Sequence, residues 1–241
     1  MEQHIVSSYD EELKYILRRI SEMGGQAERM VEQAVSALIR SDWGLAQSVV
    51  ADDILLDSLQ REVDERAIMT IGKRQPMARD LREIVGAIRI SSDLERIGDL
   101  GKNIAKRVIA VHDHAQPVQL VRGLEHMSEL ALDQLKNVLD VYATRDHLRA
   151  VEIRTADAEI DAMYTSLFRE LLTYMMEDPR NITACTHLLF SAKNIERIGD
   201  HATNIAETVY YINTGSQMET ERPKGDSTPS IAAPSVTGEA R

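Results

Sequence analysis

The stretch DLERIGDLGKNIAKRV, residues 93–108, returns as NIERIGDHATNIAETV at residues 194–209. The five letters ERIGD are identical in the two copies, and nine of the sixteen positions match without a gap. Agreement over this length at a fixed distance indicates a duplicated structural unit. We therefore expect the chain to contain the same small fold twice.

The surrounding sequence predicts that each unit is helical. Prolines 76, 117 and 179 stand between segments of helical apolar periodicity, because proline interrupts a helix interior. Ser41 and Asp42 are suitable N-caps for the second segment, and Gly72 is a suitable end for it. The expected helices span about residues 9–38, 41–71, 76 to the first domain end, 117–142, 146–176 and 179–212.

These segments predict an all-α protein of six helices, in two tandem three-helix bundles. The expected domains are residues 1–114 and 115–214, followed by a tail at 215–241. That tail is rich in proline, glycine, serine and threonine and has no apolar periodicity. We therefore predict that it is disordered.

Composition excludes several functional classes. The net charge of −11 argues against nucleic-acid binding, because phosphates demand a basic surface. No apolar run approaches the roughly 20 residues that span a bilayer, and the start has no secretory pattern. The single cysteine, Cys185, suits a reducing compartment. We therefore expect a cytoplasmic protein.

Pairs of carboxylates four residues apart recur on four of the expected helices, and residues with this spacing share a helix face. Helical angles place the ERIGD carboxylates away from the apolar stripe, so we expect them at an edge or outside. If neighbouring helices pack antiparallel, four carboxylates converge in each bundle, and a hard or borderline metal cation would join them. The pairs are Asp53/Asp57 with Glu95/Asp99, and Asp157/Asp161 with Glu196/Asp200.

Two alternatives to a metal-binding regulator stay open. Acidic pairs also occur on ordinary solvated helices, so a metal-free helical scaffold or adaptor is the first alternative. The second, less favoured, is a carboxylate-bridged metalloenzyme. Di-iron bundles use Glu-x-x-His, and none of the seven histidines has a glutamate three residues before it. We therefore expect no catalytic site.

Two longer stretches, KRQPMARDLREIVGAIRISSDLERIGD (73–99) and EDPRNITACTHLLFSAKNIERIGDHATNIAE (177–207), resemble the PhoU family of phosphate-transport regulators. The resemblance extends over nearly the whole chain to about residue 212. It implies two three-helix bundles related by pseudo-twofold symmetry, with E/D-x-x-x-D motifs that bind multinuclear metal clusters. The implied ligands are the eight carboxylates above, and the expected metals are iron or zinc, with manganese or magnesium as alternatives.

The resemblance also implies a role. It predicts a non-enzymatic negative regulator of phosphate uptake and of the phosphate-starvation response. Such a regulator would link the ATPase subunit of a phosphate ABC transporter to a sensor histidine kinase. It would reach the membrane only through these partners, and a homodimer is expected.

One difference between the two copies suggests a docking surface. The turn before the first ERIGD helix is basic, whereas its counterpart EDPRN keeps only Arg180. The turn is either an ordinary solvated loop or a patch that docks an acidic partner surface. Its basic residues are Lys73, Arg74, Arg79 and Arg82.

Overall fold

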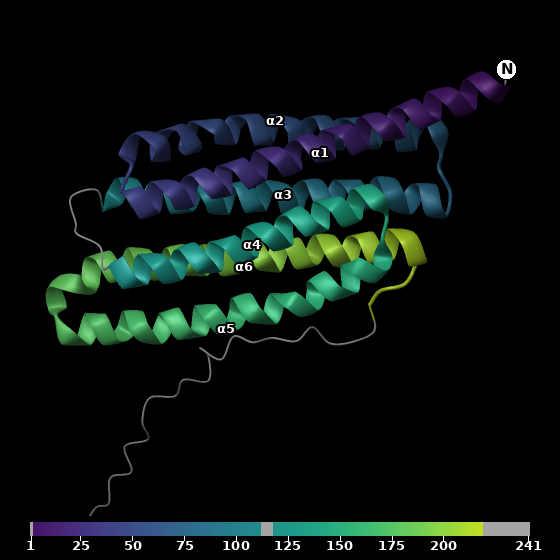
Figure 1. The fold of residues 1–241 in the computed structure, drawn as a ribbon. Coiled ribbons are helices and arrows are strands. Elements are labelled where there is room, and N and C mark those ends of the chain that lie inside the picture. Colours follow the sequence, from purple (N-terminus) through teal and green to yellow (C-terminus); the bar gives the residue numbers. More distant parts are fainter. Residues whose placement is uncertain (1, 112–117, 219–241) are drawn as a thin grey trace, which may run out of the picture.

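The computed structural model describes residues 2–111 and 118–218, and over these ranges the protein consists of helices and short connections without a β-strand (Figure 1). The all-α prediction is confirmed. The helices are α1 (Glu2–Arg40), α2 (Trp43–Arg74), α3 (Arg79–Ala110), α4 (Val118–Thr144), α5 (His147–Glu177) and α6 (Ile182–Thr214), with a 3₁₀ turn, η1 (Pro179–Asn181), before α6.

Side-chain caps fix the start of the middle helix in each bundle. The Asp42 carboxylate accepts a hydrogen bond from the Leu45 backbone N–H (2.9 Å), which begins α2 as predicted. Asp146 caps α5 in the same way. The predicted end of α2 at Gly72 is wrong, because the helix continues to Arg74 and Gln75 takes the left-handed conformation there (φ 48°). A non-glycine residue thus ends α2, and Gly72 lies inside it.

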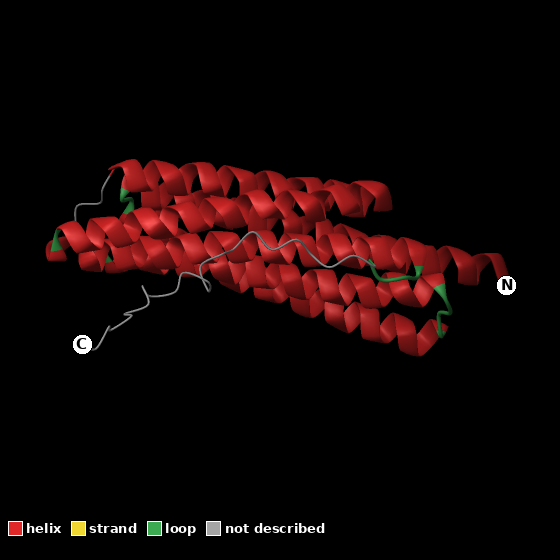
Figure 2. Cartoon of the chain, turned by 90° about the horizontal axis from the view of Figure 1, so that it is seen from below, coloured by secondary structure: helices red, strands yellow, loops and turns green. Residues whose placement is uncertain are grey.

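The helices form two bundles, α1–α3 and α4–α6, that lie side by side. In Figure 1, α2 and α5 are the outer layers, and α3 and α6 meet in the middle. Figure 2 shows the helices running along a common long direction. The duplicated segments 93–108 and 194–209 help to form this arrangement, because their apolar side chains are buried in both copies. These side chains are Ile97, Ile104 and Ala105 in the first copy, and Ile198, Ile205 and Ala206 in the second.

Glycines on the central helices bring the two bundles close together. A Cβ added at Gly86 of α3 would overlap the Ile212 side chain of α6. A Cβ added at Gly24 of α1 would lie 2.5 Å from Leu139 Cδ2 of α4. The bundles therefore share one continuous core.

Some predictions fall outside the described ranges. The boundary expected at residue 114 lies within 112–117, and residues 219–241 of the predicted tail also lie outside. Residues 215–218, assigned to that tail by composition, have a defined place: Gly215 ends α6 (φ 77°), and Met218 packs against the core. None of the helices in the described ranges is both long and apolar enough to cross a bilayer.

Candidate metal-binding clusters

The first carboxylate cluster comprises Asp53 and Asp57 of α2 with Glu95 and Asp99 of α3. Lys102, one turn after Asp99, connects α2 and α3 in this cluster. The Lys102 Nζ lies 2.6 Å from Asp53 Oδ2 and 2.5 Å from Asp99 Oδ1. One carboxylate from each helix, Asp53 and Asp99, therefore contacts the same ammonium group.

The charges in this cluster influence one another. Burial first, and then the negative charges of Asp99 and Asp57, raise the pKa of Glu95, although nearby Arg96 opposes the shift. Burial alone would lower the pKa of Lys102, but its hydrogen bonds to Asp53 and Asp99 prevail and raise it. The cluster thus favours a cation, and Lys102 supplies one.

The second carboxylate cluster comprises Asp157 and Asp161 of α5 with Glu196 and Asp200 of α6. The prediction that the ERIGD carboxylates lie at an edge or outside is wrong for Glu196, which is only 5% exposed. Asp157 and Asp161 of α5 are also buried, at 1% and 4% exposed. The angle around a single helix contains no information about a neighbouring helix that covers it. In this bundle α5 packs against α6, and the charge of Asp161 acts on Glu196.

The glycine of the repeated motif explains part of this burial. A Cβ at Gly199 would lie 2.9 Å from Asp157 Oδ1, so the absence of a side chain leaves space for that carboxylate. Gln134 of α4 holds the same oxygen, since its Nε2 donates to Asp157 Oδ1 (3.3 Å) and to Thr203 Oγ1 (3.0 Å). In the first bundle, a Cβ at Gly98 would overlap Leu56 instead.

Glu196 carries an unsatisfied oxygen in this buried position. Lys193 Nζ lies 2.7 Å from Glu196 Oε1, whereas Glu196 Oε2 is buried and has no hydrogen-bond partner within the described chain. Burial raises the pKa of Glu196, Lys193 opposes the shift, and the charges of Asp200 and Asp161 add to it. A buried carboxylate oxygen without a donor is an expected ligand for a cation.

The carboxylates of the two clusters do not form a closed metal site in the described ranges. In the described ranges, no group of three or more His, Cys, Asp or Glu side chains is arranged to hold a metal ion. The donor set nevertheless suits hard or borderline cations, because the clustered groups are carboxylates and one buried oxygen lacks a partner. Lysines, which the sequence prediction missed, contact both clusters: Lys102 in the first and Lys193 in the second.

Each of these lysines lies three residues from a predicted ligand, Lys102 after Asp99 and Lys193 before Glu196. Residues three apart lie on neighbouring positions of a helix surface. The spacing was therefore visible in the sequence. It could not indicate that Lys102 also reaches α2.

Within the chain, the basic turn is partly neutralised. Arg74 donates to both oxygens of Glu12 (3.1 and 3.2 Å), and Arg82 Nε donates to the Ile212 carbonyl (3.5 Å). Lys73 and Arg79 are exposed. The exposed positive charge of the predicted docking patch therefore rests mainly on these two residues.

Comparisons with known proteins agree with this architecture. A family model described as the PhoU domain matches residues 20–108 and again residues 124–209. A phosphate-specific transport system accessory protein PhoU homolog of Rhizobium meliloti (strain 1021) is 67% identical over 95% of this chain and 97% of its own length. A homolog of the same description from Caulobacter vibrioides (strain NA1000 / CB15N) is 50% identical over 94% and 98%.

Solved structures show the same fold. The crystal structure of PhoU from Pseudomonas aeruginosa has a TM-score of 0.84 and 36% identity, over 86% of this chain and all of that chain. The structure of the phosphate transport system regulatory protein PhoU from Streptococcus pneumoniae has a TM-score of 0.81 and 25% identity, over 88% of this chain and all of that one. Since the family model matches once in each bundle and relatives match over nearly their whole length, the chain belongs to the PhoU family.

Proposed function

We propose that this chain is the accessory regulator of a phosphate-specific transport system. In this proposal it restrains phosphate uptake and the phosphate-starvation response, without catalysing a reaction. The supporting observation is the 67% identity, over 95% of the chain, to a protein described as an accessory protein of that system. The proposed setting is the cytoplasm, and the proposed form is a homodimer.

The proposed partners are the ATPase subunit of a phosphate ABC transporter and a sensor histidine kinase. The long helical surfaces of the two bundles provide room for both. Phosphate status would reach the kinase because the transporter's conformations differ in affinity for this chain. Such a coupling free energy is typically about 1–3 kcal/mol.

The carboxylate clusters are the second part of the proposal. Asp53, Asp57, Glu95 and Asp99 would hold metal ions in the first bundle, and Asp157, Asp161, Glu196 and Asp200 in the second. Burial, and then repulsion from neighbouring carboxylates, raises the pKa of Glu95 and of Glu196, and a bound metal cluster would supply positive charge that offsets both effects. Iron or zinc is proposed first, with manganese or magnesium as alternatives.

Partner capture tests the regulatory proposal. The full chain is used as bait for the transporter ATPase subunit and the kinase, at high and low phosphate. We expect capture of both partners, with the amount depending on phosphate. The double variant Lys73→Glu, Arg79→Glu should weaken capture, whereas Arg122→Glu with Lys136→Glu, exposed on α4, should not. Failure to capture either partner at both phosphate levels would refute the proposal.

Elemental analysis tests the metal proposal. Protein purified without chelator is compared with the variant Glu95→Gln, Asp99→Asn, Glu196→Gln, Asp200→Asn. We expect more than one metal ion per chain in the unaltered protein and loss in the variant. The matched control is Glu125→Gln with Glu129→Gln, an exposed carboxylate pair of the same spacing on α4. Near-zero metal in every sample would favour the metal-free adaptor, in which Lys102 remains the bridging cation.

A further inference from the structure

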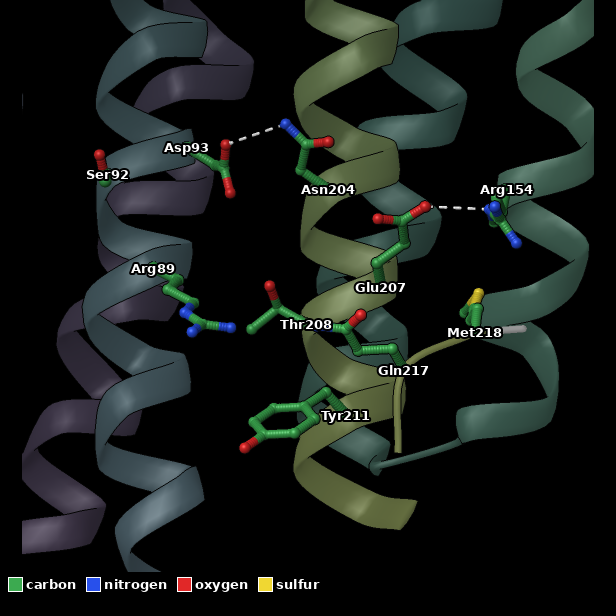
Figure 3. Close-up of a pocket in the computed structure, with 10 residues that line it drawn as sticks. All are labelled: Arg89, Ser92, Asp93, Arg154, Asn204, Glu207, Thr208, Tyr211, Gln217 and Met218. Atoms are coloured by element: carbon green, nitrogen blue, oxygen red, sulfur yellow. Dashed lines mark hydrogen bonds and ion pairs between the residues drawn. The ribbon is translucent and has the colours of Figure 1, made fainter. Parts of the chain in front are cut away.

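A polar pocket of about 540 Å³ lies where the two bundles meet (Figure 3). Its walls come from α3 of the first bundle, from α5 and α6 of the second, and from residues 217 and 218 after α6. Small-molecule sites usually have volumes of roughly 300–1,000 Å³ and often lie between domains. None of the eight carboxylates proposed as metal ligands lines this pocket.

The two acidic groups of the pocket already have partners. Glu207 Oε1 lies 2.9 Å from Arg154 Nε. Arg154 is buried, with only 6% of the residue exposed. Asp93 Oδ1 lies 2.8 Å from His201 Nδ1 and accepts a longer hydrogen bond from Asn204 Nδ2 (3.5 Å). Glu207 is therefore held by Arg154, and Asp93 by His201 and Asn204, and neither carboxylate forms an ion pair with Arg89 in the described part of the chain.

The remaining cation of the pocket is Arg89. Its guanidinium carbon lies 5.7 Å from the centre of the Tyr211 ring, and no carboxylate in the described ranges pairs with it. In Figure 3 the guanidinium points from α3 towards Thr208 of α6. The pocket thus combines an arginine without an acidic partner, near an aromatic ring, with the neutral hydrogen-bonding groups of Thr208, Tyr211 and Gln217.

The neutral donors come from different directions. Thr208 and Tyr211 extend from α6, and the Gln217 amide extends from the segment after α6, whereas Ser92 of α3 points away from α6 in Figure 3. A planar carboxylate offers two oxygens in one plane, whereas a phosphate group offers oxygens in several directions. Arginine is well suited to a phosphate group because its planar fork donates two parallel hydrogen bonds.

We propose that this pocket binds the phosphate group of a small soluble molecule, with Arg89 as the principal charge partner and Thr208 as a hydroxyl donor. The source is either free inorganic phosphate or a phosphate monoester. The cavity has room for the organic part of an ester. Because the ligand would contact α3 and α6 together, its binding would stabilise the junction of the two bundles.

Calorimetric titration of the full chain tests the proposal with three probes: inorganic phosphate, adenosine 5′-monophosphate and succinate. We expect saturable binding of one or both phosphate compounds, with a Kd below about 1 mM, and weaker binding of the dicarboxylate. Tighter binding of inorganic phosphate would identify the free anion as the ligand, and tighter binding of the nucleotide would identify an ester.

The variant Arg89→Gln should weaken binding at least about tenfold, as expected for loss of a charge-assisted hydrogen bond. Arg169→Gln, an exposed arginine of α5 outside the pocket, should bind as the unaltered chain does. Thr208→Val supplies a second variant, and circular dichroism verifies that each variant is folded. The proposal is overturned if neither phosphate compound saturates by about 10 mM, if succinate binds most tightly, or if folded Arg89→Gln binds normally.

This test is independent of the proposed function. Arg89→Gln leaves all eight carboxylates and the exposed residues Lys73 and Arg79 in place. Metal content and partner capture at fixed phosphate can therefore persist when phosphate binding is lost. Conversely, a chain without metal can still bind phosphate in this pocket.

Discussion

At the scale of single residues, Lys102 has the most consequential contacts in the first cluster. It is buried enough for its charge to matter, with 18% of its side chain exposed, and it contacts carboxylates on two helices. Removal of one member of a buried charge group is costly, because the remaining charges lose their partner. The lysine therefore has a testable structural role even without metal.

Replacement of Lys102 by glutamine should destabilise the metal-free protein by about 1–3 kcal/mol, because Asp53 and Asp99 lose their ammonium partner. For a chain of this size this corresponds to a fall in Tm of roughly 2–4 °C per kcal/mol. Thermal unfolding followed by circular dichroism measures it. Lys106→Gln, an exposed lysine one turn further along α3, is the control. Equal shifts in the two variants would show that the bridge adds no stability.

A second prediction concerns Asp64 of α2 and pH. Burial raises the pKa of Asp64, although its hydrogen bond with Ser91 opposes the shift. The folded state therefore binds a proton at pH values where the unfolded state has lost it, so this group's stabilising contribution declines as pH rises through the folded pKa. The stability of Asp64→Asn relative to the unaltered chain should therefore increase as pH rises through the acidic range.

Urea unfolding at a series of pH values measures this effect. The adjacent residue provides the control variant, Glu65→Gln, which removes an exposed carboxylate of the same helix. A stability of Asp64→Asn relative to the unaltered chain that falls as pH rises would contradict the assigned direction.

At the scale of helices, the glycines show what sequence periodicity can and cannot predict. Gly72 and Gly199 both lie inside helices, yet their surroundings differ. A Cβ at Gly72 would meet nothing within 4 Å, whereas one at Gly199 would meet Asp157, Ile160 and Gln134 at 2.9–3.1 Å. Substitution by alanine should therefore have opposite effects at the two sites.

Gly72→Ala should stabilise the protein by about 0.5–1 kcal/mol, because alanine loses less backbone entropy in a helix. Gly199→Ala should destabilise it by about 1–3 kcal/mol through overpacking. It should also displace Asp157 and reduce the metal content of the second cluster. Chemical unfolding and elemental analysis of both variants check this, and a stabilised Gly199→Ala that retains its metal would contradict it.

This contrast also explains which parts of the fold the sequence could predict. The number and order of the helices follow from apolar periodicity and proline positions, and the repeat follows from the duplicated segments 93–108 and 194–209. All of these are local signals in the sequence. The burial of Asp157 depends on Gly199 and Gln134, which are 42 and 23 positions away. The arrangement around Arg89 likewise requires α3 and α6 to meet. Such sites arise from contacts between elements, and one sequence without structure does not specify them.

At the scale of the whole molecule, the two bundles should unfold together. α3 packs against α6 as closely as it packs against its own neighbours, and α1 also contacts α4. Trp43 is the single tryptophan and begins α2, so its fluorescence reports on the first bundle alone. Far-UV circular dichroism reports on both bundles.

We expect the two signals to give the same urea midpoint, as a cooperative transition requires. As a second check, both signals are measured on the variant Gly86→Leu. The larger side chain at the junction of α3 and α6 should lower both urea midpoints together. Midpoints that separate in the unaltered chain would mean that the bundles unfold independently, and the continuous core would then contribute little to cooperativity.

The junction of α3 with α6 also has an evolutionary consequence. The third helix of one repeat packs against the third helix of the other, and the first helix of each repeat likewise meets its counterpart. Contacts between equivalent surfaces are the property that defines a twofold-symmetric dimer. A half-length ancestor with one repeat could therefore have built the same body from two separate chains. Fusion of its gene would then have freed the two halves to diverge, and a pocket such as the one around Arg89 could arise in one orientation only.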